Sequence, residues 1–506
     1  MDEKNRISII SQLYAIADVE HICKSTLQLG IILFDSYLKT NPSNGNLEFY
    51  SICCLLIANK VDDPAIILPC DILYLTQFPD FIDCYPKVEY EILSSIDYQV
   101  YFEIPAQYDY LFEALPNHII SMAHYLIDIL FHTGSYDKFA PLYMIEHMIL
   151  FVENILNLNM QDPFVLEVYF QWKKFEPKFT FIGKKFQTKI IIPEYVIPQE
   201  LIPIEPYVKP ALLPLIMTSD QIISAKQLEF ISSGTYGEVH LCLCSISMDS
   251  MNSMNSMNSM NSMNSMNSME IIAIKTMKSE DLSLYGMNFV ALREINSLRI
   301  LKSHPSIIKL LGFNYDQSNG IFKLGFELMS MTLQEKVNSD DIAYSLKISY
   351  SMQLLSGVKY LHENNLMHRD LTPRNILLDE THQIIKIADF GLSRDFRSKK
   401  YVHNYSGEIC TLYFRPPEII LGTNTYGEKV DVWSSACVIG FIWKGNYLFQ
   451  GKNDKELLES IYKELDENSC LKNMDGNVTG VLEKMLIFNP EERIDSTEAY
   501  ELMIRI

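Results

Sequence analysis

The chain has 506 residues, which is longer than one ordinary domain and predicts two or three. Hydrophobic residues make up 48% and charged residues 21%, a composition that supports buried cores and excludes a wholly disordered polyelectrolyte. The net charge is 42 − 63 = −21, which argues against general binding to nucleic-acid phosphates, because such binding needs clustered Lys and Arg.

The sequence contains no feature of a secreted or membrane protein. Its first residues, MDEKNR, start no apolar segment, and no run of 18 apolar residues occurs, so we expect neither a signal peptide nor a membrane span. The ten cysteines are scattered and form no CxxC pair. We therefore expect a soluble intracellular protein with reduced thiols, in the cytoplasm or the nucleus.

Charge divides the chain into three segments. The net charge is 7 − 21 = −14 in residues 1–160, 7 − 7 = 0 in residues 161–224 and 28 − 35 = −7 in residues 225–506. Residues 1–160 are predicted to be all helical, because apolar residues recur there at helical spacing and Asn, Pro and Gly mark the breaks. The expected helical stretches are residues 7–16, 26–38, 49–57, 88–96, 118–131 and 140–156.

Residues 161–224 contain eight prolines, which lack the backbone donor that a helix needs, so we predict an extended linker. Six lysines lie in 173–189, where a solvated linker and a basic docking strip are both open interpretations. The next segment, 225–506, begins with strand-like sequence and ends with helical patterns. It is interrupted by six Met-Asn-Ser copies at 251–268, which we interpret as a loop insertion spanning 248–269. A Met-rich adaptive binding surface is the alternative.

Several motifs in this last segment together indicate phosphoryl transfer. A glycine-bearing turn at 231–239 would bring backbone amides close to phosphate oxygens. Lys275 then ends the strand-like run Ile-Ala-Ile-Lys, and Glu294 follows on an amphipathic helix. His-Arg-Asp-Leu-Thr-Pro-Arg-Asn at 368–375, Asp-Phe-Gly at 389–391 and Pro-Pro-Glu at 416–418 complete an ordered set that resembles the eukaryotic protein kinases.

The resemblance implies a two-lobed α+β kinase fold that binds ATP and Mg²⁺ and phosphorylates protein Ser/Thr hydroxyls. Lys275 would hold the α- and β-phosphates, and Glu294 would fix the position of Lys275. Asp389 and Asn375 would bind Mg²⁺. Asp370 would orient the substrate hydroxyl. Thr411 is a further implied catalytic residue and favours Ser/Thr specificity. The resemblance places the nucleotide next to Ser232, Gly234, Gly237, Val239, Ala273, Phe326, Glu327, Met329 and Leu377 as well.

Two stretches resemble the cyclin-dependent group of kinases in particular: 291–295, within the expected helix, and 405–418. Ser406 falls at that group's activating phosphosite, which an activating kinase would modify. The three arginines that would bind this phosphate are Arg293, Arg369 and Arg394. Arg415 and the small Cys410 are compatible with a pocket for a substrate proline that directly follows the phosphorylated Ser or Thr. Glu418 and Arg493 resemble the pair that locks the lower lobe of these kinases.

Three departures from this group bear on activity. Ser232 replaces the first loop glycine, and Thr372 replaces the catalytic-loop lysine that touches the γ-phosphate, a loss that would slow transfer. The stretch from 451 to 490 is also short for the group, which puts docking of its small accessory subunit in doubt.

Residues 6–115 resemble the cyclin box. Arg6, the run Thr-Leu-Gln-Leu at 26–29 and Asp35 follow one part of its pattern, and Cys53 to Asp63 follows another. The resemblance makes Lys60 and Glu89 candidates for the contact with the kinase helix that carries Glu294, although ordinary helix-end charges are the alternative. Residues 119–156 resemble the start of a second, truncated cyclin repeat.

These patterns predict a multidomain protein in which an all-α cyclin fold is followed by a kinase fold. We expect a cyclin-dependent Ser/Thr kinase whose activator lies in the same chain, with ATP and protein substrates as partners and no nucleic acid or membrane. The fused arrangement resembles proteins of giant DNA viruses. Two alternatives stay open: a pseudokinase scaffold, suggested by Ser232 and Thr372, and a cyclin-like module that acts on a host kinase in trans.

Overall fold

A computed structural model presents the chain as two compact units, one within residues 1–211 and one within residues 212–506. The structure describes residues 3–41, 46–62, 67–73, 78, 80–100, 102, 104–105, 117–138, 140–141, 144–145, 148, 168, 215, 217–234, 237–246, 268–278, 286–301, 303–339, 341–396, 411–423, 426–466, 470–472 and 474–506.

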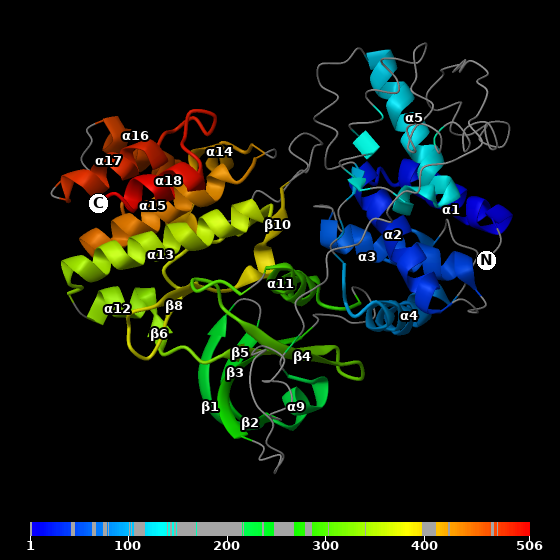
Figure 1. The fold of residues 1–506 in the computed structure, drawn as a ribbon, viewed down its shortest axis with the longest axis horizontal. Helices are drawn as coiled ribbons and strands as arrows, with labels where there is room; N and C mark the ends of the chain where they lie inside the picture. Colours follow the sequence, from blue (N-terminus) through cyan, green and yellow to red (C-terminus); the bar gives the residue numbers. More distant parts are fainter. Residues whose placement is uncertain are drawn as a thin grey trace, which may run out of the picture. The chain divides into compact units, whose positions relative to one another are not determined.

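The described part of the first unit is helical (Figure 1), which confirms the predicted helical class of this segment. The helix expected at 140–156 falls largely outside the described residues. The helices are α1 (Glu3–Val19), α2 (Lys24–Thr40), α3 (Leu47–Asp62), α4 (Phe81–Ser95) and α5 (Asn117–Thr133), with a 3-10 turn η3 (Ser135–Lys138).

One ion pair joins helices that are far apart in the sequence. Arg6 on α1 contacts Asp35 on α2, with Arg6 Nη2 2.6 Å from Asp35 Oδ2. Arg6 also donates through Nη1 to the carbonyl of Phe131 on α5, and Tyr136 donates its hydroxyl to the same Asp35 oxygen at 2.7 Å. These contacts tie α1, α2, α5 and η3 together through one partly buried carboxylate.

A second ion pair joins α3 to α4. Lys60 Nζ contacts Glu89 Oε1, and both side chains are buried. Tyr85 donates its hydroxyl to the same Glu89 oxygen at 3.0 Å, and the Lys60 ammonium lies 5.0 Å from the centre of the Tyr85 ring. Burial lowers the pKa of Lys60, while the Glu89 carboxylate acts in the opposite direction. The two candidate interface residues are therefore partners of each other, and removing either charge would leave the other buried and uncompensated.

The second unit begins with a five-stranded antiparallel sheet in the order β1-β2-β3-β5-β4. The pairing of β2 with β3 continues to Ile246 and Ser268, so the Met-Asn-Ser repeat connects two neighbouring strands of this sheet. The predicted insertion lies outside the described residues except for Ser268 and Met269, which begin β3. The five strands are β1 (Lys226–Gly234), β2 (Gly237–Ile246), β3 (Ser268–Lys278), β4 (Leu310–Asp316) and β5 (Ile321–Glu327).

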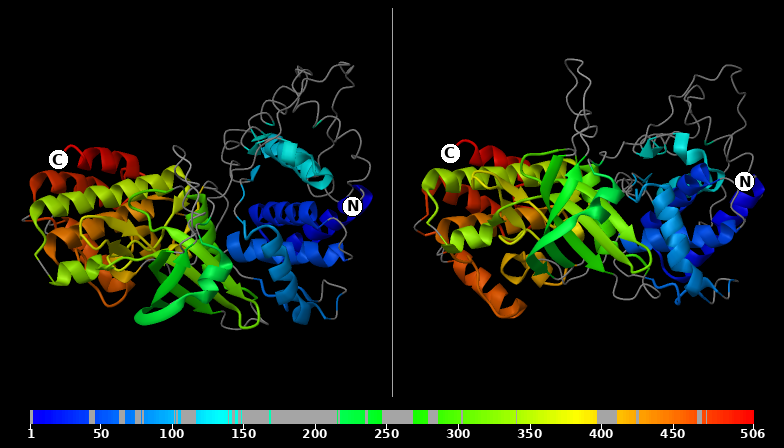
Figure 2. Two further views of the ribbon diagram at one scale, coloured as in Figure 1. Left: turned by 60° about the horizontal axis from the view of Figure 1, so that its bottom comes forward. Right: turned by 90° about the horizontal axis from the view of Figure 1, so that it is seen from below.

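Helices dominate the rest of this unit, and those from α12 onward gather on the side away from the sheet, as the further views also show (Figures 1 and 2). The sheet with helix α11 and the helical part correspond to the two predicted lobes. The helices are α11 (Phe289–Ile300), α12 (Leu333–Ser339), α13 (Tyr344–Glu363), α14 (Pro417–Ile420), α15 (Lys429–Lys444), α16 (Asp454–Asp466), α17 (Gly476–Met485) and α18 (Ser496–Met503). Short elements between them are β6 (Met331–Thr332), β7 (Leu366–Met367), β8 (Ile376–Leu378), β9 (Ile385–Ile387), η6 (Phe390–Leu392), β10 (Arg394–Asp395) and η7 (Leu412–Phe414).

A buried ion pair holds the helical lobe together. Arg493 donates to both carboxylate oxygens of Glu418, at 2.8 and 2.9 Å, and lies over the ring of Trp433. It also donates to the carbonyls of Ile487 and Lys429, so the guanidinium binds several segments at once. This places Glu418 and Arg493 together as the sequence predicted. Among the helices that the structure describes, none is long and apolar enough to cross a membrane.

The residues just before β1 form a short helix, α9 (Ser219–Ser224), which packs against the sheet. Thr218 and Gln221 form a reciprocal capping box at its start. Ile222 joins a buried cluster with residues of β2, β3 and β4, and the N–H of Met217 donates to the carbonyl of Leu311 at 2.8 Å. The expected linker range of 161–224 is therefore too long, because its last residues belong to the second unit.

Two glycines of the sheet make room for this segment. A Cβ added at Gly325 would lie 2.5 Å from Ile222 Cδ1, and one added at Gly312 would lie 2.8 Å from the carbonyl oxygen of Met217. A side chain at Gly312 would therefore displace the backbone that leads into α9, and one at Gly325 would force the Ile222 side chain to move. The two glycines thus leave room for this segment against the sheet.

Ile222→Ala is expected to destabilise the second unit by about 2–5 kcal/mol, because it removes buried methyl groups and leaves a cavity against the sheet. A thermal unfolding scan of the full chain should show the corresponding transition fall by about 3–8 °C. The matched control is Ile223→Ala, whose side chain is 53% exposed and should change the transition little. Equal shifts in the two variants would contradict the packing of α9.

Candidate active site

Strand pairing positions the glycine turn over Lys275. Gly234 pairs with Gly237 at the end of the β1–β2 hairpin, and Val239 on β2 pairs with Lys275 on β3. A Cβ added at Gly237 would collide with the carbonyl oxygen of Thr276, so only glycine allows β2 and β3 to approach this closely. Of the other predicted nucleotide contacts, Ser232 lies on β1, Ala273 on β3 and Leu377 on β8.

Helix α11 carries Glu294 and has a well-defined start. Asn288 is its N-cap, and its side-chain oxygen accepts from the N–H groups of Val290 and Ala291. The Asn288 amide also donates to the carbonyl of Lys278 at the end of β3, which ties the helix start to the sheet. Cap and strand together fix where Glu294 meets β3.

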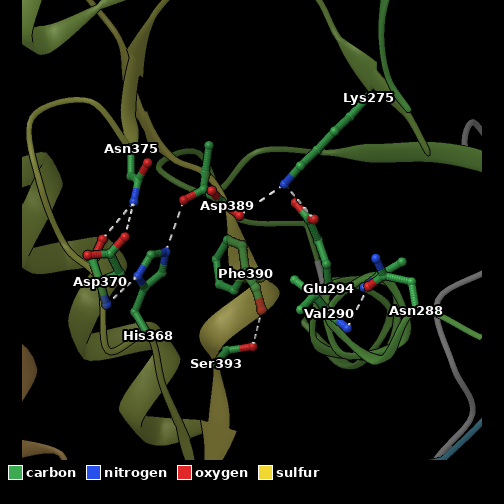
Figure 3. A network of polar contacts seen from close by, with 12 residues as sticks. Lys275, Asn288, Val290, Glu294, His368, Asp370, Asn375, Asp389, Phe390 and Ser393 are labelled. Atoms are coloured by element: carbon green, nitrogen blue, oxygen red, sulfur yellow. Dashed lines mark hydrogen bonds and ion pairs between the residues drawn. The ribbon is translucent and has the colours of Figure 1, made fainter. Parts of the chain in front are cut away.

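Lys275 forms two ion pairs at the centre of the site (Figure 3). Its Nζ lies 2.8 Å from Glu294 Oε2 and 2.9 Å from Asp389 Oδ1. Burial alone would lower the pKa of Lys275, but the two carboxylates act against it and raise the pKa overall. Burial would likewise raise the pKa of Asp389, yet the Lys275 charge and hydrogen bond hold it below its usual value. Lys275 and Asp389 are therefore charged at neutral pH.

A second contact connects α11 to the segment after Asp389. Ser297, one turn beyond Glu294, lies with its Oγ 2.6 Å from the Oγ of Ser393, and both residues are fully buried. Ser393 also donates to the carbonyl of Phe390 (Figure 3). Helix α11 is thus joined to this segment in two places. Glu294 and Asp389 both contact Lys275, and Ser297 contacts Ser393 directly. No local sequence pattern predicts this contact.

The catalytic loop brings three predicted residues into direct contact. Asn375 donates through Nδ2 to the carbonyl of Asp370 at 2.8 Å and to its carboxylate Oδ2 at 2.9 Å. Thr411 donates to the other carboxylate oxygen through both its N–H and its hydroxyl, at 3.0 Å each. Asp370 is therefore held in place from both sides by neutral donors.

The backbone of this loop is fixed by a buried aspartate on α15. Asp431 accepts from the N–H groups of His368 and Arg369 at 2.7 and 2.8 Å. Burial would raise the pKa of Asp431, but its hydrogen bond and ion pair with His362 lower it overall. Arg369 has φ of 69° and Asp389 of 64°, a left-handed backbone that non-glycine residues adopt at a cost and that recurs at functional sites.

The predicted nucleotide contacts Phe326, Glu327 and Met329 lie at the end of β5 and just after it. Phe326 pairs with Ala273 and is 8% exposed, while the Glu327 side chain accepts from Lys386 Nζ at 2.7 and 2.9 Å. Glu327 Oε1 also accepts from the backbone N–H of Lys309. The resemblance places Glu327 next to the nucleotide, and its side chain also links β5 to β9. Met329 follows β5 and is half-buried.

The three predicted phosphate-binding arginines are all buried, but their phosphosite is not described. Arg369 donates to the carbonyl of Leu392 and to the hydroxyl of Tyr426, and Arg293 lies over the Phe289 ring. Arg394 on β10 pairs with Met367, two residues before Arg369, so these two arginines lie on adjoining segments. Ser406 and Cys410 lie outside the described residues.

The arrangement fits a nucleotide with a divalent cation, as the sequence predicted. The Asp389 side chain is 33% exposed and engages Lys275 through one oxygen, and Asn375, which donates its nitrogen to Asp370, keeps its amide oxygen as an acceptor. In Figure 3, Asp389 is drawn between Lys275 on one side and Asn375 with Asp370 on the other. Carboxylate and amide oxygens are the hard ligands that Mg²⁺ prefers.

Comparison with known proteins agrees with this geometry. The protein kinase domain model matches residues 257–503, a range that contains Lys275, Glu294, Asp370, Asn375 and Asp389. Three similar proteins come from Acanthamoeba polyphaga mimivirus. Putative serine/threonine-protein kinase L670 is 30% identical over 96% of this chain and 90% of its own length. L673, which carries the same description, is 26% identical over 90% of this chain and 85% of its own length.

The third relative, putative serine/threonine-protein kinase L268, is 39% identical, but only over 38% of this chain and 36% of its own length. The similarity to L670 and L673 extends through both units, whereas the family model is confined to the second. The chain belongs to the protein kinase family, as a serine/threonine kinase that uses ATP and a divalent metal ion.

Proposed function

We propose that this kinase is of the cyclin-dependent type and that its first unit is a cyclin-like activator carried in the same chain. The observation that supports this most directly is the pairing of residues that suggested the cyclin resemblance. Arg6 contacts Asp35 and Lys60 contacts Glu89, so each pair joins two helices of the first unit. Charged residues are rarely buried unless they are paired, so these positions differ from ordinary solvated helix-end charges.

In the proposed reaction, ATP bound with Mg²⁺ supplies the γ-phosphoryl group to a Ser or Thr hydroxyl of a protein. Lys275 holds the α- and β-phosphates, and Glu294 orients the lysine. Asp389 and Asn375 would hold the cation through their side-chain oxygens. Asp370 accepts the hydroxyl proton as the new oxygen–phosphorus bond forms and the bond to the departing ADP breaks, and Thr411 holds the Asp370 carboxylate in position.

A pseudokinase scaffold is the weaker reading. Thr372 is 3% exposed and its carbonyl accepts from the N–H of Asn375, so this position stabilises the loop instead of presenting a charge. The loss of the usual lysine is nevertheless accompanied by an intact set of charged contacts among Lys275, Glu294 and Asp389. A chain that had no need of phosphoryl transfer would not need to hold these three buried or partly buried charges together.

The proposed activator role is tested by removing the first unit. Residues 212–506 are expected to transfer phosphate at least about tenfold more slowly than the whole chain, because α11 would lose the contact that favours its active position. The fragment starts at 212 so that α9 is kept, since a fragment starting at 225 would expose the sheet face that α9 covers. Initial rates with radiolabelled ATP and a serine peptide provide the measurement.

The control is the same fragment with residues 1–211 added as a separate chain. Restored activity at high concentration is expected, because a tether acts mainly by raising the effective concentration into the mM range. If residues 212–506 alone are as active as the whole chain, the first unit is not an activator. Lys60→Glu is a less direct test, since it would place two carboxylates together within the first unit itself.

A further inference from the structure

One cation of the catalytic loop has no role in the chemistry described above. Arg374 lies between Pro373 and Asn375 and is exposed, whereas the three residues before it, Leu371 to Pro373, are buried. The loop backbone around it is fixed: the carbonyl of Pro373 accepts from the N–H of Gln334, and the carbonyl of Asn375 accepts from the N–H of Ala388. A rigid loop therefore presents one exposed guanidinium group.

Arg374 lies close to the place where a substrate hydroxyl must sit. The Asn375 amide contacts both the carbonyl and the carboxylate of Asp370, so residues 370 and 375 are neighbours in space. The Cα of Arg374 is about 3.8 Å from that of Asn375, as in any trans peptide. Because an extended peptide advances about 3.3 Å per residue, a substrate held at Asp370 passes within reach of this long side chain at one to three residues from the acceptor.

Two other cations of the second unit are already engaged. Lys275 pairs with Glu294 and Asp389, and Arg415 lies with its Nη1 2.6 Å from Asp454 Oδ1. Arg374 makes no ion pair or hydrogen bond with any residue in the part of the chain that the structure describes. With Thr372 neutral and buried, Arg374 is also the exposed positive charge of the loop from 370 to 375.

We propose that Arg374 selects protein substrates that carry an anionic side chain, carboxylate or phosphate, within three residues of the phosphorylated Ser or Thr. A guanidinium group is always charged and presents paired donors that match both anions. This inference rests on the kinase activity but not on the cyclin-like role of the first unit. Arg374 is a specificity-determining residue, because it contacts a part of the substrate that does not react.

The test uses the full-length protein and serine peptides that differ at one position. Each position from three before to three after the serine carries Asp, phosphoserine, Ala or Lys in turn, and kcat/KM is measured for each peptide. The wild-type protein is expected to prefer Asp or phosphoserine over Ala by roughly fivefold at one or two positions. Comparison of the two anions shows whether the site favours acidic or previously phosphorylated substrates.

Charge reversal provides the decisive comparison. Arg374→Glu is expected to reverse the preference at the same positions, so that the Lys peptide becomes better than the Asp peptide, while kcat for the Ala peptide stays within about twofold. Arg374→Lys should retain the preference in weaker form, and Arg505→Glu, an exposed arginine near the end of α18, should leave it unchanged. The effect should appear in the KM for peptide and not in the KM for ATP.

Three results would overturn the inference. The first is a wild-type preference that is the same for Asp, Ala and Lys. The second is a preference that Arg374→Glu does not change. The third is that Arg374→Glu raises the KM for ATP above the wild-type value equally with every peptide, which would mean that Arg374 contacts the nucleotide phosphate. Absence of any transfer by the wild-type protein would contradict the proposed function as well, whereas transfer with a flat preference contradicts only the role of Arg374.

Discussion

Asp370→Asn is expected to lower kcat by about 10²–10⁴-fold, the range that general acid–base groups contribute. The Asp370 carboxylate accepts from Asn375 and twice from Thr411, so its position is fixed before any substrate arrives. An asparagine has nearly the same shape but no negative charge and cannot take the hydroxyl proton. Initial rates at saturating ATP and peptide measure the change.

The substitution should leave nucleotide affinity and stability nearly unchanged, which separates loss of chemistry from loss of structure. ATP affinity by fluorescence titration and the thermal midpoint provide these two checks. Asp341→Asn is the matched control, because the side chain of Asp341 is fully exposed. Activity of Asp370→Asn within threefold of wild type would mean that another group orients the hydroxyl.

Glu294→Gln is expected to lower kcat/KM for ATP by about 10²-fold or more, since one missing charge-stabilising contact of this kind costs about 2.7–4 kcal/mol. Lys275 now divides its charge between Glu294 and Asp389, at 2.8 and 2.9 Å. Without the glutamate charge, the lysine would stay with Asp389. It would then neutralise the carboxylate that the metal ion needs and move away from the phosphates.

This explanation predicts a metal-dependent signature. The concentration of Mg²⁺ that gives half-maximal activity should rise in Glu294→Gln, because Asp389 becomes a weaker ligand. Glu363→Gln changes an exposed glutamate that pairs with Lys359 on the surface, and it should leave both activity and metal dependence unchanged. An unchanged Mg²⁺ dependence together with lost activity would point to helix displacement as the sole cause.

The ordered kinase motifs could be predicted from sequence because each one is a short run whose residues act together. Lys275, Glu294, Asp370, Asn375 and Asp389 were all identified in this way. The direct contact between Lys275 and Asp389 could not be foreseen, since the two residues are separated by 114 positions and no pattern specifies their distance. The same reason explains why the contact between Ser297 and Ser393 was missed.

Helix α9 could have been found. Proline-rich sequence ends at Pro214, and Thr218 followed three residues later by Gln221 is a capping-box pattern. Six helical residues are too few for an apolar period to be visible, so the composition of the preceding linker dominated the prediction. The space that α9 occupies depends on two glycines of β4 and β5, which a local pattern cannot connect to it.

The helices of the first unit followed from apolar periodicity, which is reliable for long amphipathic segments. Their cross-connections did not. Arg6 and Asp35 are 29 residues apart, and so are Lys60 and Glu89. Only the family resemblance singled these four residues out. That resemblance suggested that Lys60 and Glu89 contact the helix that carries Glu294, whereas in the structure they form an ion pair with each other.

The pairing of β2 with β3 has a consequence for the inheritance of this gene. Ile246 and Ser268 remain neighbours because the strands hold them together, whatever the number of Met-Asn-Ser units encoded between them. The entropic cost of closing a connection rises only with the logarithm of its length, by about 0.6 kcal/mol for each doubling. Replication errors that add or delete whole triplets of codons would thus be nearly neutral for folding, and isolates of the source should differ in copy number at this one place while the flanking strands stay the same.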